Sequence, residues 1–263
     1  PPLRNPLELK RLAVSRLGKK VITMKDVEFS YPGTSAPVVE GLDWLIGPGD
    51  RYGILGANGA GKSTFIKLLL GLYEPKQGSI LVDGRSVKDR TPKERKRLFA
   101  AAFQDFYRYP LSVKENLSMC QNGEKTTADY IAALEMVGLE TLKDKLDYKI
   151  GKYGENSTDL SDGQWQKIAL ARVLLSDAKM FLLDEPTASM DPIGESKLYE
   201  DMMNVMKDRG VIIVTHRLAL AKTVDLIAVM RDGGIVGLGS HEELMENNAY
   251  YRQLCDAQSE WYR

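Results

Sequence analysis

The residues with the most specific chemistry form one short stretch of the chain. In order, it reads Gly56, Ala57, Asn58, Gly59, Ala60, Gly61, Lys62, Ser63 and Thr64. Its glycines let the backbone bend tightly and approach phosphate oxygens without a Cβ in the way. The N–H groups of such a loop converge on an anion, reinforced by the positive end of the following helix. Lys62 adds a point charge for the β- and γ-phosphates, and the hydroxyl of Ser63 is a ligand for Mg²⁺. The pattern therefore predicts a phosphate-binding loop.

The segments beside this loop have the pattern that phosphate binding requires. Tyr52–Leu55 is a short apolar run of strand type, and Phe65–Leu70 continues as a buried helix that Gly71 can end. The alternative is a glycine-rich turn that opens an ordinary helix. The order strand, loop, helix favours phosphate binding over that alternative.

Two adjacent carboxylates form a second candidate site. Asp184 and Glu185 directly follow the apolar run 180–183, which places them at the carboxyl end of a buried strand. Ligands bind at that edge of open α/β sheets. In phosphate-loop enzymes an aspartate there helps to hold Mg²⁺, and a neighbouring glutamate can take a proton from an attacking water. The alternative is an exposed acidic pair at a strand end.

A third stretch, Ser161–Gln164, precedes a predicted helix that runs to Leu175. The start of a helix offers N–H groups, and this one adds a hydroxyl and, at Gly163, a residue that permits close approach. It can therefore hold another phosphate. Taken alone, the pattern fits an ordinary N-cap at Ser161 better.

Apolar runs and turn residues predict an α/β fold. The predicted strands are 21–31, 38–46, 52–55, 79–82, 99–103, 180–183, 211–214, 226–230 and 235–238. Further helices are predicted at 92–98, at 192–207 and after Ser240, with Glu243 completing a capping box. Runs such as 180–183 and 211–214 are typical of a parallel sheet covered on both faces. Between 105 and about 160 no such run occurs, and Thr126 with Asp129 begins a helix. We therefore expect a phosphate-loop NTPase core with a mainly parallel sheet, an N-terminal antiparallel β subdomain and an inserted α-helical subdomain.

The composition argues against several other classes of protein. Thirty-six basic residues balance 36 acidic ones, so we expect no nucleic acid as a partner. The cysteines, Cys120 and Cys255, argue against a disulfide scaffold and suit a reducing compartment. The histidines, His216 and His241, are too few for a His-rich metal site. No apolar run approaches the roughly 20 residues that a membrane-spanning helix needs.

In this order the motifs resemble those of ATP-binding cassette ATPases, the nucleotide-binding domains of ABC transporters. The likeness runs from about Val21 to Gly239, nearly the whole chain. It implies a site for ATP and Mg²⁺. Residues 56–64 match the Walker A loop of the family, and Tyr31 matches the aromatic residue that stacks on adenine.

The resemblance also implies roles for residues farther along the chain. Gln104 looks like the Q-loop glutamine, which contacts Mg²⁺ and water and begins the helical subdomain. Asp184 looks like the Walker B ligand of Mg²⁺, and Glu185 like the catalytic glutamate. Asp191 matches the D-loop, and His216 matches the switch histidine that contacts the γ-phosphate.

The stretch that begins at Ser161 is similar to the family's signature motif. This implies that Ser161, Gly163 and Gln164 face ATP held by a partner domain. Asp162 replaces the usual first glycine, and residues 189–190 (Ser-Met) replace the more usual Ala-Leu of the D-loop. The carboxylate of Asp162 would lie near a phosphate of like charge. We therefore expect its side chain to point outward, toward a cation on the partner.

Several individual residues also have a simpler structural interpretation. Tyr31 can be an ordinary aromatic at a strand end, Gln104 a surface glutamine, and His216 a polar cap on strand 211–214. We expect His241, which belongs to no motif, to face solvent in the first turn of a helix. Trp165 is expected to pack in the core and not to contact a cofactor.

The expected domains are a basic connector at 1–20, an ATP-binding α/β core at 21–104 and 160–240, a helical subdomain at 105–159 and a helical tail at 241–263. The connector carries six basic residues and one acidic residue. Such a segment fits either a solvated tail or the cytoplasmic side of a membrane helix. Because the chain begins at Pro1 and has no methionine before Met24, we expect it to be a piece of a longer polypeptide.

The end of the chain, from Gly239 to Leu254, resembles the end of exporter-type cassettes, and Gln164–Lys167 resembles exporters of peptides such as lantibiotics. The resemblance implies a domain that binds MgATP, pairs head-to-tail with a second nucleotide-binding domain and hydrolyses ATP. It would work with the transmembrane domain of the same transporter, at the cytoplasmic face of the cell membrane. One alternative is a soluble cassette ATPase acting on DNA or ribosomes. Another is a binding-only cassette, against which Glu185 and His216 argue.

Overall fold

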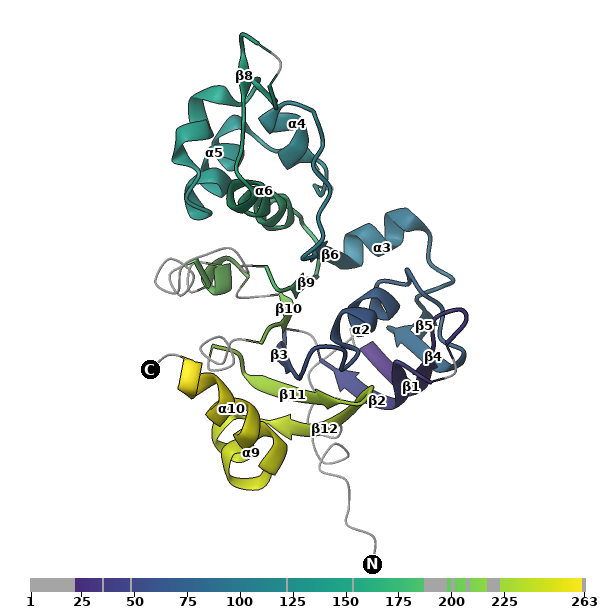
Figure 1. The fold of residues 1–263 in the computed structure, drawn as a ribbon. Coiled ribbons are helices and arrows are strands. Elements are labelled where there is room, and N and C mark those ends of the chain that lie inside the picture. Colours follow the sequence, from purple (N-terminus) through teal and green to yellow (C-terminus); the bar gives the residue numbers. More distant parts are fainter. Residues whose placement is uncertain are drawn as a thin grey trace, which may run out of the picture. The chain divides into compact units, whose positions relative to one another are not determined.

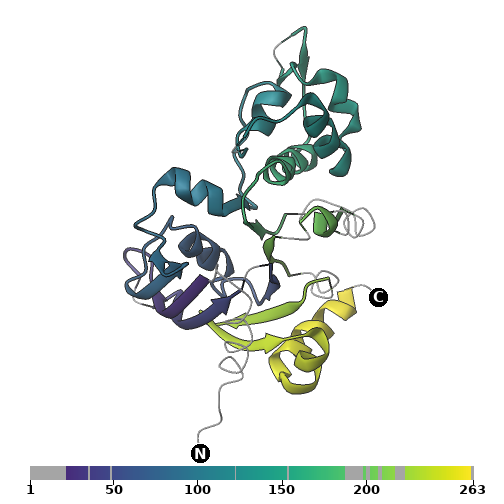
Figure 2. The same cartoon turned by 180° about the vertical axis from the view of Figure 1, so that it is seen from behind.

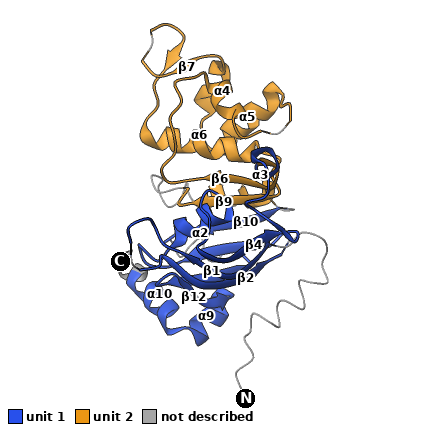
Figure 3. Ribbon diagram, turned by 90° about the vertical axis from the view of Figure 1, so that its right-hand side faces the viewer, with its two compact units in different colours: residues 1–95, 208–263 blue, residues 96–207 orange. Residues whose placement is uncertain are grey.

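The computed structural model divides into two compact units, residues 1–95 with 208–263 and residues 96–207 (Figure 3). The first unit is thus built from two stretches of sequence that flank the second. The structure describes residues 22–34, 36–47, 49–121, 123–152, 154–186, 198–199, 202–206, 209–216 and 223–261. The expected connector at 1–20, residues 189–190, Asp191 and most of the predicted helix 192–207 lie outside the described residues.

An antiparallel sheet of four strands belongs to the first unit. Its order is β2 (Val39–Ile46), β1 (Ile22–Phe29), β4 (Gln77–Val82) and β5 (Arg85–Ser86). Met24 of β1 pairs with Trp44 on one side and Ile80 on the other, and all three side chains are buried. The turn Asp83–Gly84 joins β4 to β5 with both residues at positive φ, as expected of a tight hairpin.

Parallel strands carry the glycine loop in the same unit. β3 (Arg51–Leu55) lies between β10 (Gly210–Val214) and β11 (Leu226–Arg231), parallel to both, and β12 (Gly234–Gly239) is antiparallel to β11. Helix α2 (Lys62–Leu69) follows β3 after the loop. The indole of Trp44 lies edge-on to the ring of Tyr52 and against Phe65. One buried side chain therefore ties the antiparallel sheet to β3 and to α2.

Two helices at the end of the chain pack on the outer strands of this unit, drawn in yellow beside β11 and β12 in Figures 1 and 2. They are α9 (His241–Asn247), which begins with the predicted capping box of Ser240 and Glu243, and α10 (Ala249–Trp261). Their apolar cluster comprises Leu55, Ile227, Val229, Leu244, Tyr251 and Cys255. His241 lies in the first turn of α9 as expected and is partly exposed, but its Nδ1 also lies 2.8 Å from the hydroxyl of Tyr251. A buried tyrosine needs such a polar partner.

The second unit combines a strand pair with a group of helices. β6 (Phe99–Ala102) runs parallel to β9 (Met180–Asp184) and follows α3 (Pro92–Leu98). The helical part contains α4 (Val113–Ser118), α5 (Thr127–Met136), the 3₁₀ helix η1 (Glu140–Lys145) and α6 (Asp162–Leu174), with α4 and α5 both packed on α6. Each of the three α-helices begins with a capping box, so its first N–H groups are satisfied locally.

The fold class predicted from the sequence is confirmed: mainly parallel strands, a separate antiparallel sheet and an added group of helices. The predicted strand 21–31 ends earlier, at Phe29, because Pro32 and Gly33 turn the chain. The parallel pair β7 (Lys149–Ile150) and β8 (Ser157–Thr158) was not predicted. Strands of two residues are too short to show a periodic pattern. The domain limits expected from the sequence are not those of the two compact units and stay a prediction.

Gly78 offers a test of how the antiparallel sheet is held. It has φ +82°, and a Cβ there would lie 2.1 Å from the carbonyl oxygen of Asp26, where β1 is irregular. We expect Gly78→Ala to lower the free energy of unfolding by about 3 kcal/mol, since it combines backbone strain with a clash against main chain. The measurement is urea unfolding followed by circular dichroism.

Gly84→Ala is the matched control for this substitution. Gly84 has φ +74°, but no atom lies within 4 Å of the added Cβ. Only the backbone strain remains, about 1 kcal/mol. Equal losses for the two variants would show that the close approach at Gly78 does not matter.

Candidate functional site

The glycine loop joins β3 to α2 as predicted. Gly59 and Gly61 have φ of +81° and +94°, in the left-handed region that glycine tolerates best. A Cβ on Gly56 would lie 2.3 Å from the carbonyl oxygen of Met230, and one on Gly61 would lie 2.5 Å from that of Val38. Glycine is therefore required at Gly56 and Gly61 by the packing of the loop, independently of any ligand.

The start of α2 has the features of an anion site. Its N-cap, Gly61, provides no side-chain hydrogen bond to the first N–H groups of the helix. The positive end of the helix dipole is therefore not neutralised by a side-chain cap. The buried ammonium of Lys62 donates hydrogen bonds to the carbonyl oxygens of Gly56 and Ala57, at 2.8 and 3.0 Å. The cation is thus held within the loop, and Ser63 beside it is exposed. This donor set fits a phosphate.

Tyr31 lies beside the last residue of the loop. Its hydroxyl is 2.9 Å from Oγ1 of Thr64, which is buried. Its ring makes edge-on contacts with Phe29 and Tyr73, with centroids 5.2 and 5.7 Å away. Contacts from three residues thus fix a half-buried ring close to the loop. The adenine-stacking role of Tyr31 stays a prediction.

His216 reaches the same edge of the first unit. Val214 of β10 pairs with Ile54 of β3, and the N–H of Thr215 donates to the carbonyl oxygen of Ile54 at 3.2 Å. His216 comes next and is exposed. Because β3 and β10 are parallel, their carboxyl ends lie together, and His216 emerges beside the start of the glycine loop.

The second unit brings the other polar candidates together by the same topology. Asp184 is the buried last residue of β9, and Gln104 follows the parallel strand β6, whose Ala102 pairs with Leu183. Gln104, Asp184 and Glu185 therefore emerge at one edge. Gln104 is exposed, as a surface glutamine would also be.

The backbone of Glu185 is unusual. Its φ is +48°, which for a residue with a side chain costs roughly 1 kcal/mol or more. Its carbonyl oxygen accepts a hydrogen bond from Nε2 of Gln166 on α6 at 3.3 Å. Gln166 was missed by sequence reasoning, although it lies only two positions after Gln164. Strained residues cluster at functional sites, so this geometry supports a functional role for Glu185.

The start of α6 is an N-cap, the alternative that the sequence left open. Oγ of Ser161 accepts from the N–H of Gln164 at 3.3 Å, and Oε1 of Gln164 accepts from the N–H of Ser161 at 2.9 Å. The side chains of Ser161 and Gln164 thus satisfy the helix end from within. Gly163 is half-buried, and Trp165 is buried in the core as expected. Contact of these residues with a partner's ATP stays a prediction.

Comparison with known proteins decides the family. The family model described as "ABC transporter" matches residues 39–188, more than half of the chain. This chain belongs to the ABC transporter family. Residues 39–188 include the glycine loop, the start of α6 and the carboxylates at the end of β9. The ATP-binding cassette predicted from the motifs is confirmed.

Individual relatives agree with this assignment. The subtilin transport ATP-binding protein SpaT of Bacillus subtilis is 36% identical over 243 residues, which are 90% of this chain and 40% of that protein. The nisin transport ATP-binding protein NisT of Lactococcus lactis is 32% identical over 234 residues, 87% of this chain and 39% of that protein. An ATP-dependent lipid A-core flippase of Mannheimia succiniciproducens is 34% identical over 237 residues, 89% of this chain and 40% of that protein.

A solved structure, that of a bacterial Atm1-family ABC exporter with ATP bound, superposes with a TM-score of 0.81 at 28% identity. It covers 92% of this chain and 42% of the other. The chain thus spans about two fifths of the length of the relatives it matches. By their names these proteins are transport ATP-binding proteins, a flippase and an exporter, and not soluble machines acting on DNA or ribosomes. Among the described residues, no helix has both the length and the apolar character needed to cross a membrane.

The sequence predicts three ligands for Mg²⁺. Ser63 belongs to the first unit, and Gln104 and Asp184 belong to the second. Within the part of the chain that the structure describes, no cluster of three or more His, Cys, Asp or Glu side chains is suited to a metal ion. A hydroxyl and a single carboxylate suit Mg²⁺, which is usually held by one or two carboxylates, phosphate oxygens and water.

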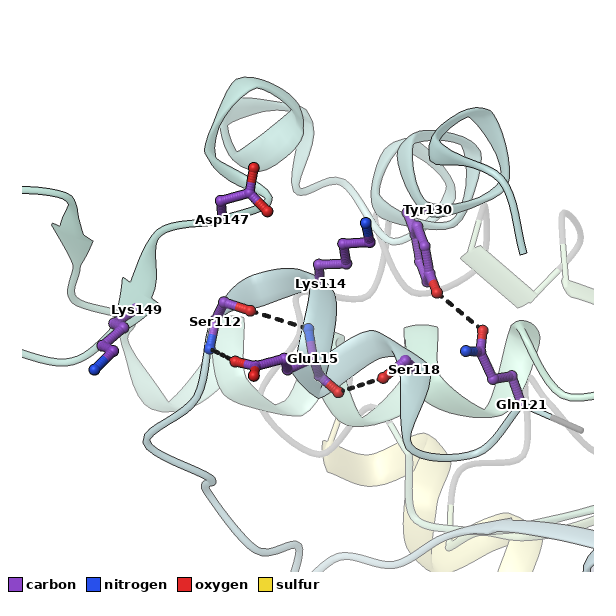
Figure 4. A pocket seen from close by; sticks show the side chains of 8 residues that line it. All are labelled: Ser112, Lys114, Glu115, Ser118, Gln121, Tyr130, Asp147 and Lys149. Carbon is purple, nitrogen blue, oxygen red and sulfur yellow. Dashed lines mark hydrogen bonds between the residues drawn. The ribbon is translucent and has the colours of Figure 1, made fainter. Parts of the chain in front are cut away.

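A polar hollow of about 580 Å³ lies in the helical part of the second unit (Figure 4). It is lined by Ser112, Lys114, Glu115, Ser118, Gln121, Tyr130, Asp147 and Lys149. Its polar groups largely bond one another. The N–H of Ser112 donates to Glu115 at 2.8 Å, and the hydroxyl of Tyr130 donates to Gln121 at 3.0 Å. Two lysines balance two carboxylates, and we assign no ligand to it.

The position of Lys62 predicts its effect on ATP binding. We expect Lys62→Ala to weaken ATP binding by at least about tenfold, because a charge-assisted hydrogen bond to phosphate is lost. Lys88→Ala removes an equal charge from an exposed surface pair with Glu74 and should leave the affinity unchanged. Equilibrium titration with labelled ATP measures both. Unchanged affinity for Lys62→Ala would contradict the role of the loop.

The position of the Tyr31 ring predicts that it contributes to binding of the adenine base and not of the phosphates. Tyr31→Ala should weaken ATP binding by about tenfold, since base stacking on an aromatic ring contributes roughly 1–3 kcal/mol. Binding of inorganic triphosphate should not change. Tyr31→Phe, which keeps the ring and loses only the contact with Thr64, is the matched control and should retain most of the affinity. If triphosphate binding falls as much as ATP binding, the ring serves the loop and not the base.

Proposed function

We propose that this chain is the nucleotide-binding domain of an ABC exporter, which binds MgATP and hydrolyses it to drive transport. The observation that carries the proposal is the glycine loop. It presents a helix start without a side-chain cap together with the buried cation of Lys62. The named relatives, which are transport proteins and a flippase, support the same function.

The first unit supplies the binding of the nucleotide. The N–H groups of the loop and Lys62 hold the phosphates, and Tyr31 stacks on the adenine. The hydroxyl of Ser63 is a ligand for Mg²⁺, which neutralises charge on the phosphates when bound. His216, at the same edge as the loop, contacts the γ-phosphate. The positions described for β3, β10 and α2 support these proposed roles.

The second unit supplies the groups that act on water. Glu185 accepts the proton of the attacking water, a task that needs a carboxylate at a fixed position. Its backbone is held by the hydrogen bond from Gln166 to its carbonyl oxygen. Asp184, buried at the end of β9, is a ligand for Mg²⁺. Gln104 contacts the metal and the water from the end of β6.

The proposed partners are a second nucleotide-binding domain and a transmembrane domain. Ser161, Gly163 and Gln164 face the ATP of the partner domain in a head-to-tail dimer, to which Asp191 contributes as well. The chain would lie at the cytoplasmic face of the membrane. A peptide is the proposed cargo, because the relatives named for subtilin and nisin transport match over most of this chain.

Glu185→Gln tests the proposal. The amide cannot accept the proton of water, so hydrolysis should fall at least about 100-fold. ATP should still bind, and with ATP present the variant should elute as a dimer in size-exclusion chromatography. Glu135→Gln, which changes an exposed glutamate on α5, should behave as the wild type.

Two outcomes would contradict the proposal. Normal turnover of Glu185→Gln would refute the role of Glu185 as base. Wild-type activity per molecule that stays constant over a wide dilution series would refute the dimer, because a site completed by a partner must lose activity on dilution.

A further inference from the structure

Asp162, the residue that departs from the family pattern, has a partner within its own chain. Its Oδ1 lies 2.9 Å from Nη1 of Arg108. The sequence led us to expect relief of its charge from a cation on the partner domain. The structure supplies that cation from the segment that follows Gln104.

Arg108 is anchored on both sides through the backbone of its neighbours. Nη1 of Arg172 donates to the carbonyl oxygen of Tyr107 at 3.1 Å. Nδ2 of Asn116 donates to the carbonyl oxygen of Tyr109, also at 3.1 Å. Arg172 and Asn116 are buried, with 6% and 0% exposure. The main chain that carries Arg108 is therefore held by hydrogen bonds from two buried side chains.

The two anchoring residues also bond each other. Nε of Arg172 donates to the carbonyl oxygen of Asn116 at 3.1 Å, and its Nη2 bonds Oδ1 of Asn116. Its guanidinium lies over the ring of Tyr109 at 5.2 Å. Burial lowers the pKa of Arg172, but an arginine stays charged in a protein. Since Arg172 belongs to α6, as Asp162 does, one helix holds both the carboxylate and the segment that brings its counter-charge.

The pair itself adds little to folding. The side chain of Arg108 is 48% exposed and that of Asp162 is 81% exposed. An exposed ion pair contributes only about 0–1 kcal/mol. Its place in the chain points to another purpose, because Asp162 directly follows Ser161, which the proposed function puts against the partner's ATP. A carboxylate without a counter-charge would repel the phosphates of that ATP, most strongly where water is excluded.

The geometry points to Arg108 as a positioning residue that neutralises Asp162 and so allows the start of α6 to approach the partner's ATP. This inference rests on the proposed function. The usual glycine at the position of Asp162 needs no counter-charge, so Arg108 matters only because this chain carries an aspartate. Arg108 makes no contact with nucleotide in this proposal, and acts through Asp162 alone.

A suppressor experiment on the 263-residue chain tests it. ATP hydrolysis is measured over a range of ATP concentrations at fixed protein for the wild type, Arg108→Ala, Asp162→Gly and the double variant. Arg108→Ala should raise the ATP concentration at half-maximal rate about threefold, the size expected from loss of one exposed charge pair, with kcat unchanged. Asp162→Gly should stay close to the wild type, and the double variant should return to it. Arg108→Lys keeps the positive charge, so its ATP concentration at half-maximal rate should stay close to that of the wild type.

Arg97→Ala, which removes an exposed charge from α3, is the control for net charge and should change nothing. If Arg108→Ala resembles the wild type, or the double variant is as defective as Arg108→Ala alone, the inference is overturned while the proposed function stands. If the melting temperature and kcat both fall in Arg108→Ala and in the double variant, the role of Arg108 is structural instead. Wild-type activity proportional to protein concentration would overturn the dimer, and this role of Arg108 with it.

Discussion

The rest of the first unit depends on how closely main chain approaches main chain at the glycine loop. The carbonyl oxygens of Met230 and Val38 occupy the space that a Cβ on Gly56 or Gly61 would need. The loop is therefore set against the end of β11 and against the residue that precedes β2. This contact fixes the point at which α2 begins, and with it the place of Lys62. A substitution here would displace the anion site before it altered any contact with a ligand.

In the second unit, an irregular segment is held in place by side chains. The segment between β6 and α4 has no regular structure, so its carbonyl groups need partners from elsewhere. Asn116 and Arg172 provide them for Tyr107 and Tyr109, and Asn116 also donates to the carbonyl oxygen of Leu111. Burying a charged guanidinium is unfavourable unless its donors are satisfied. Here Arg172 donates to the carbonyl oxygen of Tyr107 in the segment and to Asn116 of α4, which makes the conformation of the segment and the packing of α4 on α6 interdependent.

The helix starts of α2 in the first unit and α6 in the second differ in their electrostatics. α2 begins at Gly61 without a side-chain cap and carries a buried lysine beside it. α6 begins with the capping box of Ser161 and carries Asp162 in its first turn, where a carboxylate interacts favourably with the helix dipole. One start is prepared for an anion. The other is already satisfied from within, and the negative charge of Asp162 opposes the approach of a phosphate to it.

The sequence by itself determined the features that depend on neighbouring residues. The glycine loop, the capping boxes of α5 and α9 and the apolar strands follow from local spacing, because hydrogen bonds and burial periods within one element involve residues a few positions apart. Only the tertiary structure decided which distant side chains meet. Tyr31 reaches Thr64, His241 reaches Tyr251, and Arg108 reaches Asp162 across 54 positions of sequence. No periodicity encodes such pairs, because they arise where the topology brings two loops or helix ends together.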